Sequence, residues 1–145
     1  MRKATLLYRI ASVILILFAA GHTFGFLTLR PPSAEGRAVY EAMQTVHFQI
    51  GGSVFSYGGF YTGFGISITA NILFLALLTW RLGTLAATDP QAIGLLGWGL
   101  FALQVASFIL SWMYFSIQPA MLSGLLALCL GWAAWIVRNP PQKSI

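Results

Sequence analysis

Residues 5–29 read TLLYRIASVILILFAAGHTFGFLTL, and this uninterrupted, largely apolar stretch decides the fold class. As an α-helix, its 25 residues would extend about 37 Å. A lipid bilayer has a hydrocarbon core about 30 Å thick, and inside it the backbone must satisfy its own hydrogen bonds. The stretch therefore predicts a transmembrane helix.

The beginning of this stretch also has features of a secretory signal peptide. Arg2 and Lys3 form a basic start, and Ala19-Ala20-Gly21 offers small residues at which a peptidase cuts. Because the apolar run continues to Leu29, we expect a first helix that is retained. Cleavage before His22 stays open as the alternative.

Three more segments are long and apolar enough to span a bilayer. They cover residues 59–82, 90–115 and 117–137, after a first span at residues 5–29. The alternation of apolar and polar residues that marks a membrane β-barrel is absent. The sequence thus predicts an all-α fold, with one membrane domain over residues 1–145 built as a four-transmembrane-helix bundle.

The breaks between these segments have local causes. Proline lacks an N–H group and disfavours helix in the preceding residue, so Arg30-Pro31-Pro32 should end the first span and Asn139-Pro140-Pro141 the fourth. Thr88-Asp89-Pro90 is typical of a helix start, with a capping residue before a first-turn proline. The short stretch Ser116–Pro119 predicts a tight antiparallel hairpin of the last two helices.

The composition excludes several classes of protein. Apolar residues make up 58% of the chain and charged residues 8%, whereas soluble domains carry about a quarter charged residues. Lys and Arg lie at the ends of the apolar runs, not in a stripe with aromatic residues, so we expect no nucleic-acid binding. Cys129 is the single cysteine, which excludes an internal disulfide and a cysteine-pair metal site.

The distribution of Lys and Arg predicts the orientation, because positive residues concentrate on the cytoplasmic side. One side of the predicted membrane carries Arg2, Lys3, Arg9, Arg81, Arg138 and Lys143. The other carries Arg30 and Arg37, together with Glu35 and Glu41. We therefore expect a multi-pass protein of the cytoplasmic (inner) membrane with both termini in the cytoplasm.

The longest connection, residues 31–58, contains a predicted amphipathic helix from about Ala34 to Ile50. Ser33 can cap it, and Glu35 lies in the first turn, where negative charge is favourable. Its apolar face recurs at spacings of three and four: Val39, Met43, Val46 and Ile50. Whether the helix forms a lid over the bundle or lies in the lipid head groups stays open.

Glycines follow this helix. The run from Gly51 to Gly59 predicts a flexible joint before the second span. Gly59 and Gly63 are four residues apart, as in small-xxx-small helix contacts, and Gly65 follows. We expect close packing of the second span against a neighbour there; approach of the backbone to a ligand is the alternative.

Polar side chains at membrane depth need partners or a purpose. Asn71 and Gln104 lie midway along the second and third spans, so an interhelical amide hydrogen bond is expected; lining a polar cavity is the alternative.

His22 lies in the outer half of the first span, and His47 at the end of the amphipathic helix. We predict an outer ligand-binding site formed by His22, Thr23, Glu41, Gln44, His47, Tyr57 and Tyr61. For His22 alone, a structural hydrogen bond inside the bundle is the simpler interpretation.

These features favour a non-enzymatic membrane protein. It would bind a small hydrophobic ligand, a lipid or a quinone, under the outer cap, or serve as a subunit of a larger membrane complex. A haem or metal-binding redox protein using His22 and His47 is an alternative, and so is a small oligomeric transporter or channel. No phosphate loop, zinc-protease motif or dinucleotide fingerprint is present, so no catalytic residue, metal site or cofactor is predicted.

Two short motifs carry a resemblance to known sequences. Residues 9–13 (RIASV) lead into Gly21-His22-Thr23 in the first span, and Phe60–Gly65 (FYTGFG) begins the second. In these motifs the chain resembles an uncharacterised family of small bacterial four-helix integral membrane proteins, over roughly the first 80 residues. The resemblance implies a bacterial cytoplasmic membrane and points to His22, Tyr61 and Gly63, but it implies no activity.

Overall fold

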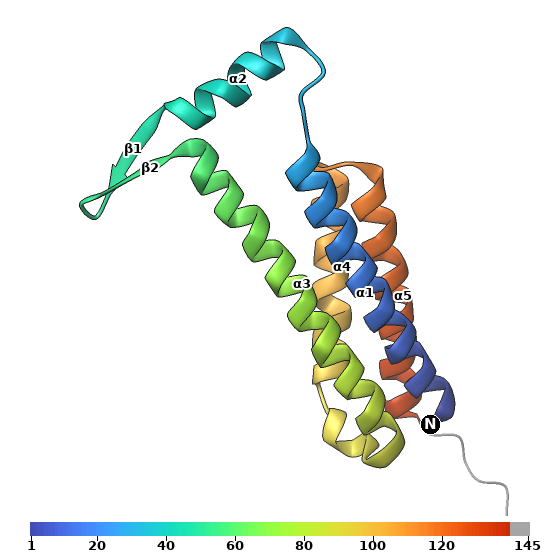
Figure 1. Cartoon of the computed structure of the whole chain (residues 1–145). Helices are drawn as coiled ribbons and strands as arrows, with labels where there is room; N and C mark the ends of the chain where they lie inside the picture. The colour runs from blue at the N-terminus through green and yellow to red at the C-terminus, as the bar shows by residue number, and fades with distance from the viewer. Residues whose placement is uncertain (140–145) are drawn as a thin grey trace, which may run out of the picture. The chain divides into compact units, whose positions relative to one another are not determined.

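The computed structural model describes residues 1–139. Pro140, Pro141 and Lys143, which entered the predicted helix end and the charge count, lie outside the described residues. In chain order the elements are α1 (Arg2–Thr28), α2 (Ala34–Thr45), β1 (His47–Ile50), β2 (Ser53–Ser56), α3 (Tyr57–Thr88), the 3-10 helix η1 (Pro90–Ile93), α4 (Leu96–Tyr114) and α5 (Ile117–Arg138) (Figure 1).

Apart from one small hairpin, the residues that the structure describes form helices and short connections, which confirms the predicted all-helical class. By length and composition, α1, α3, α4 and α5 are able to cross a membrane. The predicted ends of the first and fourth spans are confirmed to within a few residues. The second span is longer than predicted, because α3 continues past Leu82 to Thr88.

The predicted start of the third span at Pro90 is wrong. Asp89 does act as a cap, since its carboxylate accepts a hydrogen bond from Ala92 N at 3.4 Å, but it caps η1 and not a long helix. Gly94 then takes a φ of +49°, a conformation that favours glycine and ends the 3-10 helix. The long helix α4 therefore begins at Leu96.

The amphipathic helix is also shorter than predicted. Ser33 caps α2 by accepting from Gly36 N at 3.0 Å, but α2 ends at Thr45 because Val46 adopts an extended conformation. The next residues form strand β1, so His47 is a strand residue and not the last turn of a helix. Of the predicted apolar positions beyond Met43, Ile50 lies in β1, whereas Val46 is the extended residue that ends α2.

The run from Gly51 to Gly59, predicted as a flexible joint, contains the turn and the second strand of a β-hairpin and the first residues of α3. Strands β1 and β2 pair antiparallel, with Phe48 opposite Phe55. Gly51 and Gly52 make the turn with φ of +57° and +83°, the two positive values that a type I′ hairpin turn requires. β-branched and aromatic residues flank this Gly-Gly pair, which is a hairpin signal in the sequence.

The described residues form two compact units. The helical unit consists of Met1–Phe18 together with the chain from Ile72 onward, and the connecting unit consists of Ala19–Asn71. Helices α1 and α3 each contribute a segment to both units.

In the helical unit, α4 and α5 form the expected antiparallel hairpin (Figure 1). On α1, buried residues recur at spacings of four, three and four: Ala4, Tyr8, Ala11 and Leu15. They belong to a core with Leu126 and Leu130 of α5. Small residues in such a stripe allow helices to approach closely.

Polar contacts add to this packing. Ser12 Oγ donates to Ala76 O at 2.7 Å, which links α1 to α3. The Arg9 guanidinium lies 3.6 Å from the centre of the Trp80 ring and donates to Thr84 Oγ1 at 3.0 Å. A cation over an aromatic face contributes about 0.5–2 kcal/mol of stabilisation. The Trp80 ring and the Thr84 hydroxyl therefore stabilise the Arg9 charge in place of a carboxylate.

The outward faces of the long helices are strongly apolar. Leu17, Phe74 and Leu128 expose 66%, 63% and 73% of their surface. Soluble monomers rarely expose large continuous apolar areas, which usually mark contact with lipid or with another protein.

Candidate functional site

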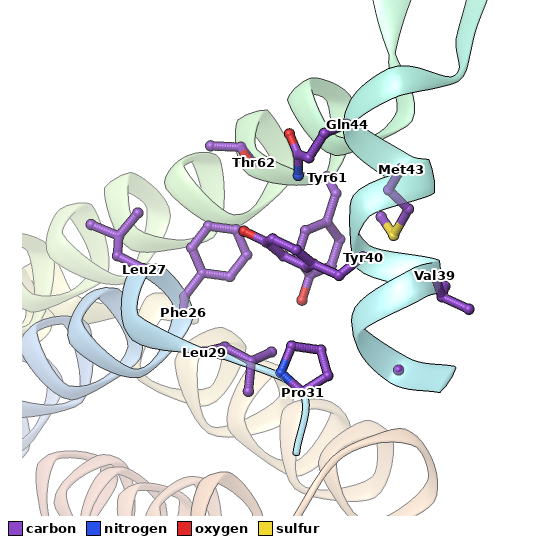
Figure 2. Close-up of a pocket in the computed structure, with 11 residues that line it drawn as sticks. Phe26, Leu27, Leu29, Pro31, Val39, Tyr40, Met43, Gln44, Tyr61 and Thr62 are labelled. Carbon is purple, nitrogen blue, oxygen red and sulfur yellow. The ribbon is translucent and has the colours of Figure 1, made fainter. Parts of the chain in front are cut away.

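The connecting unit contains a pocket of about 300 Å³ between α2, the end of α1 and the beginning of α3. Figure 2 shows the ring of Tyr40 extending from α2 toward Phe26 and Tyr61. Most of the surrounding side chains are apolar or aromatic, and a few carry hydrogen-bonding groups. The lining residues are Phe26, Leu27, Leu29, Pro31, Gly36, Val39, Tyr40, Met43, Gln44, Tyr61 and Thr62.

Helix α2 faces the pocket with a different stripe from the one predicted. Gly36, Tyr40 and Met43 are half-buried and recur at the helical spacings of four and three. Val39 reaches the rim of the pocket but leaves 62% of its surface exposed. The prediction was right for Met43 and missed Tyr40, because a tyrosine was not counted among the apolar positions.

Glycines on α3 allow the other elements to approach it. A Cβ at Gly65 would overlap the ring of Phe26, and a Cβ at Gly58 would overlap the amide of Gln44. Gly63, by contrast, has no atom within 4 Å of the place where a Cβ would lie. Close packing near the FYTGFG motif, which was predicted from Gly59, Gly63 and Gly65, therefore occurs at Gly65 and not at Gly63.

A row of aromatic rings leads from His22 to the pocket. The His22 ring is stacked on Phe26, with 5.9 Å between ring centres and an interplanar angle of 5°. Phe26 in turn lies 5.1 Å from Tyr61. His22 therefore does not line the pocket itself, but it supports a ring that does.

His22, Thr23 and Thr69 form a small hydrogen-bonded cluster next to this row. Thr23 Oγ1 donates to Ala19 O at 2.8 Å, as is common for threonine in helices. Thr69 Oγ1 lies 2.9 Å from Thr23 Oγ1 and 3.1 Å from His22 Nδ1. All three side chains are only partly buried.

The hydroxyl hydrogens of Thr23 and Thr69 limit the hydrogen-bond arrangements that are open to His22. The Thr23 hydrogen is directed to Ala19 O, so Thr23 Oγ1 is an acceptor for the Thr69 hydroxyl. The Thr69 hydroxyl also lies 3.4 Å from Gly65 O. Whichever partner receives its one hydrogen, the Thr69 oxygen can still accept a hydrogen bond. If the Thr69 hydroxyl donates to Thr23, His22 donates to Thr69 from Nδ1–H, and a neutral ring then has an unprotonated Nε2.

The other predicted site residues are placed as follows. Gln44 and Tyr61 line the same pocket. Glu41 is exposed on α2, and Tyr57 packs on Phe48 with 4.7 Å between ring centres. His47 is exposed, and its Nδ1 lies 2.7 Å from Thr45 O, to which it must donate.

These placements divide the predicted set. Gln44 and Tyr61 come together at the pocket, and His22 and Thr23 come together beside it. Phe26, Tyr40 and Thr69 complete the site and were missed. Their signal in the sequence was weak, since apolar, aromatic and threonine side chains are common in apolar helices.

The metal and haem alternatives gain no support from these contacts. Within residues 1–139, no three His, Cys, Asp or Glu side chains are grouped closely enough to hold a metal ion. The His22 ring is stacked on Phe26, and His47 Nδ1 is hydrogen-bonded to Thr45 O. Neither of these contacts joins the two histidines.

The second predicted polar feature concerns Asn71 and Gln104. Asn71 Nδ2 donates to Ser67 O at 2.8 Å within its own helix, and its side chain is exposed. Gln104 is 4% exposed on α4. The interhelical pair stays a prediction.

Comparison of the chain with protein-family models, with curated proteins and with solved structures finds no match.

Proposed function

We propose that the protein resides in the cytoplasmic membrane as a multi-pass protein with both termini on the cytoplasmic side. Four helices of sufficient length and hydropathy support this. The apolar outward faces of these helices support it as well. The orientation follows from the excess of Lys and Arg at the ends expected inside.

Within this setting, we propose that the pocket under α2 binds a small hydrophobic molecule with a hydrogen-bonding head group, a lipid or a quinone. The pocket itself is the observation that carries the proposal. Small-molecule sites are mostly apolar, with a few polar groups that fix orientation. About 300 Å³ suits a head group whose tail extends out of the pocket.

The polar groups of the lining fit such a head group. The Gln44 amide offers both donors and an acceptor, and the hydroxyl groups of Tyr40 and Tyr61 can do either. Thr62 Oγ1 donates to Gly58 O at 2.8 Å, so its oxygen is left as an acceptor. Aromatic rings at Phe26, Tyr40 and Tyr61 provide flat apolar surface for a planar head group.

The same lining supports binding in preference to catalysis. The described lining includes no Asp, Glu, His, Lys, Arg, Ser or Cys. The hydroxyl groups of Tyr40, Tyr61 and Thr62 are therefore the only side chains of the described lining that belong to the usual general acids, bases and nucleophiles.

Native mass spectrometry of the full chain from mild detergent tests the proposal. The delipidated protein is titrated separately with a quinone and with a phosphatidylcholine, which distinguishes the two sources of the ligand chemistry. The double variant Y40F/Y61F should lower the occupancy of the bound molecule by about tenfold, because two hydrogen bonds are lost. Y57F/Y114F is the control, because neither tyrosine lines the pocket.

Equal occupancy in the two double variants would reject the pocket as the binding site. Wild-type protein that binds neither molecule would reject the ligand-binding proposal altogether.

A second candidate function, a subunit of a larger membrane complex, is favoured by the hairpin. Phe48 contacts Phe55, Tyr57 and Phe60, yet Val54 and Phe55 expose 65% and 45% of their surface. An isolated two-stranded hairpin is marginally stable in water, so a covering partner would stabilise it. Partner chains retained in native spectra of the wild type, and lost on changing Val54 to Ser, would support this role.

A further inference from the structure

One end of the helical unit concentrates positive charge. Helix α1 begins there, and α3 and α5 end there (Figure 1). Arg2 and Lys3 lie in the first turn of α1, and Arg138 is the last residue of α5. The acid nearest in sequence to these ends, Asp89, already accepts a hydrogen bond from Ala92 N.

A second pocket lies at this end, separate from the one under α2. It has a volume of about 500 Å³ and lies between the beginning of α1 and the last turns of α5. Arg2 and Lys3 line it on one side, and Trp132 and Trp135 on the other. Among the described residues that line it, there is no Asp or Glu.

The tryptophans give the pocket an amphipathic wall. Trp132 and Trp135 expose 63% and 55% of their surface, and their ring centres are 6.3 Å apart. Tryptophan prefers the boundary between head groups and acyl chains. Asn139, also in the lining, donates from Nδ2 to Trp135 O at 3.1 Å, which leaves its Oδ1 as an acceptor.

We propose that this pocket binds the head group of an anionic phospholipid. The phosphate lies against Arg2 and Lys3, where the free N–H groups of the first turn of α1 add favourable charge. The glycerol and upper acyl chains lie against Trp132 and Trp135. Oδ1 of Asn139 accepts from a head-group hydroxyl, which favours phosphatidylglycerol. Basic pockets at the cytoplasmic ends of helices are known to recognise such lipids.

This inference needs the chain to reside in a bilayer, but it does not need a ligand in the pocket under α2. Its test therefore uses lipids that differ only in the head group and leaves that pocket unaltered. The full-length protein is delipidated in mild detergent and titrated with equal amounts of phosphatidylglycerol and phosphatidylcholine that carry the same acyl chains. Native mass spectrometry then gives the ratio of the two bound lipids.

Two variants with the same change of net charge make the test specific. R2Q/K3Q removes the cations of the pocket, whereas R30Q/R37Q removes two cations of the connecting unit. R2Q/K3Q should lower the preference for phosphatidylglycerol by about thirtyfold, because each of the two basic residues contributes about 1 kcal/mol near an anionic lipid and about 1.4 kcal/mol corresponds to a factor of ten. R30Q/R37Q should leave the preference unchanged. An equal loss in both variants, or in neither, would overturn the proposal.

Quenching of tryptophan fluorescence provides a second measurement. Phosphatidylglycerol with brominated acyl chains should quench the wild type more than brominated phosphatidylcholine does, and the variant W132F/W135F should lose this difference. A large excess of inorganic phosphate should not displace the lipid. Displacement would show a site for free phosphate and would overturn the assignment to a lipid, as would equal quenching by the two lipids.

Discussion

At the scale of single residues, glycines and hydroxyl groups decide how the pocket is built. Phe26 reaches α3 because Gly65 has no side chain, and Gln44 reaches it because of Gly58. Thr69 joins His22 and Thr23 by hydrogen bonds. None of these roles follows from residue type, since glycine and threonine are common in apolar helices.

Changing Gly65 to Ala should displace the ring of Phe26 and destabilise the protein. Overpacking of a close contact costs about 1–3 kcal/mol. The measurement is the free energy of unfolding, obtained by titration with a denaturing detergent. The matched control is G63A, where the space for a Cβ is open and alanine should stabilise the helix by about 0.5–1 kcal/mol. Equal effects of G65A and G63A would contradict the close contact.

Changing Thr69 to Val should release His22 from a single tautomer. The wild type should show hydrogen on Nδ1 and an unprotonated Nε2 in ¹⁵N NMR spectra of the labelled histidine, and T69V should show a mixture. The lost hydrogen bond should also lower the free energy of unfolding by about 1 kcal/mol. T88V is the control, because Thr88 bonds only within its own helix. Hydrogen on Nε2 in the wild type would show that the assignment is wrong.

At the scale of elements, hydropathy and helix-breaking residues located the four long helices, but they did not reveal the hairpin. Apolar residues from Val46 to Ile50 fit the face of a helix about as well as a strand. Gly51 and Gly52 were interpreted as a break in structure, whereas their positive φ values make a hairpin turn. Whether these residues form a helix or a strand depends on pairing with residues 53–56. The local pattern of residues 34–50 does not include that partner strand.

Cysteine pairs test the register of this hairpin. Tyr57 N donates to Val46 O at 3.2 Å. Because bonded and non-bonded pairs alternate along an antiparallel ladder, Gln49 and Val54 form a non-bonded pair with Cα atoms about 4.5 Å apart. In a C129S background, the pair Q49C/V54C should therefore oxidise readily to a disulfide.

The control for the hairpin is Q49C/S53C. Ser53 is opposite Ile50, so its side chain and that of residue 49 point to opposite faces of the hairpin. This pair should stay reduced under the same oxidising conditions, as measured by mass after labelling of free thiols. Similar oxidation of both pairs would contradict the register and favour a flexible segment.

At the scale of the whole molecule, the distribution of charge leads to the proposed topology. The hairpin and η1 would lie on opposite sides of the membrane, because α3 separates them. Gln49 in β1 and Gln91 in η1 are both exposed, so each can carry a reporter cysteine.

In a C129S background, an impermeant maleimide should label Q49C on intact cells. It should label Q91C only after the membrane is opened. The physical reason is the excess of Lys and Arg near η1 and the chain termini, which holds that side in the cytoplasm. The opposite labelling pattern would reverse the proposed orientation, and labelling of both sites on intact cells would contradict four spans.

The sequence by itself determined the all-helical fold class, the four long helices of the described residues and most of their ends. These properties depend on local hydropathy and on prolines, so a window of residues contains the necessary information. The tertiary structure alone decided that Tyr40 and Phe26 face one pocket, that Gly65 is the close contact and that Arg2, Lys3 and two tryptophans meet at another. Such groupings depend on pairing between distant segments, whose energies are set by packing and not by local composition.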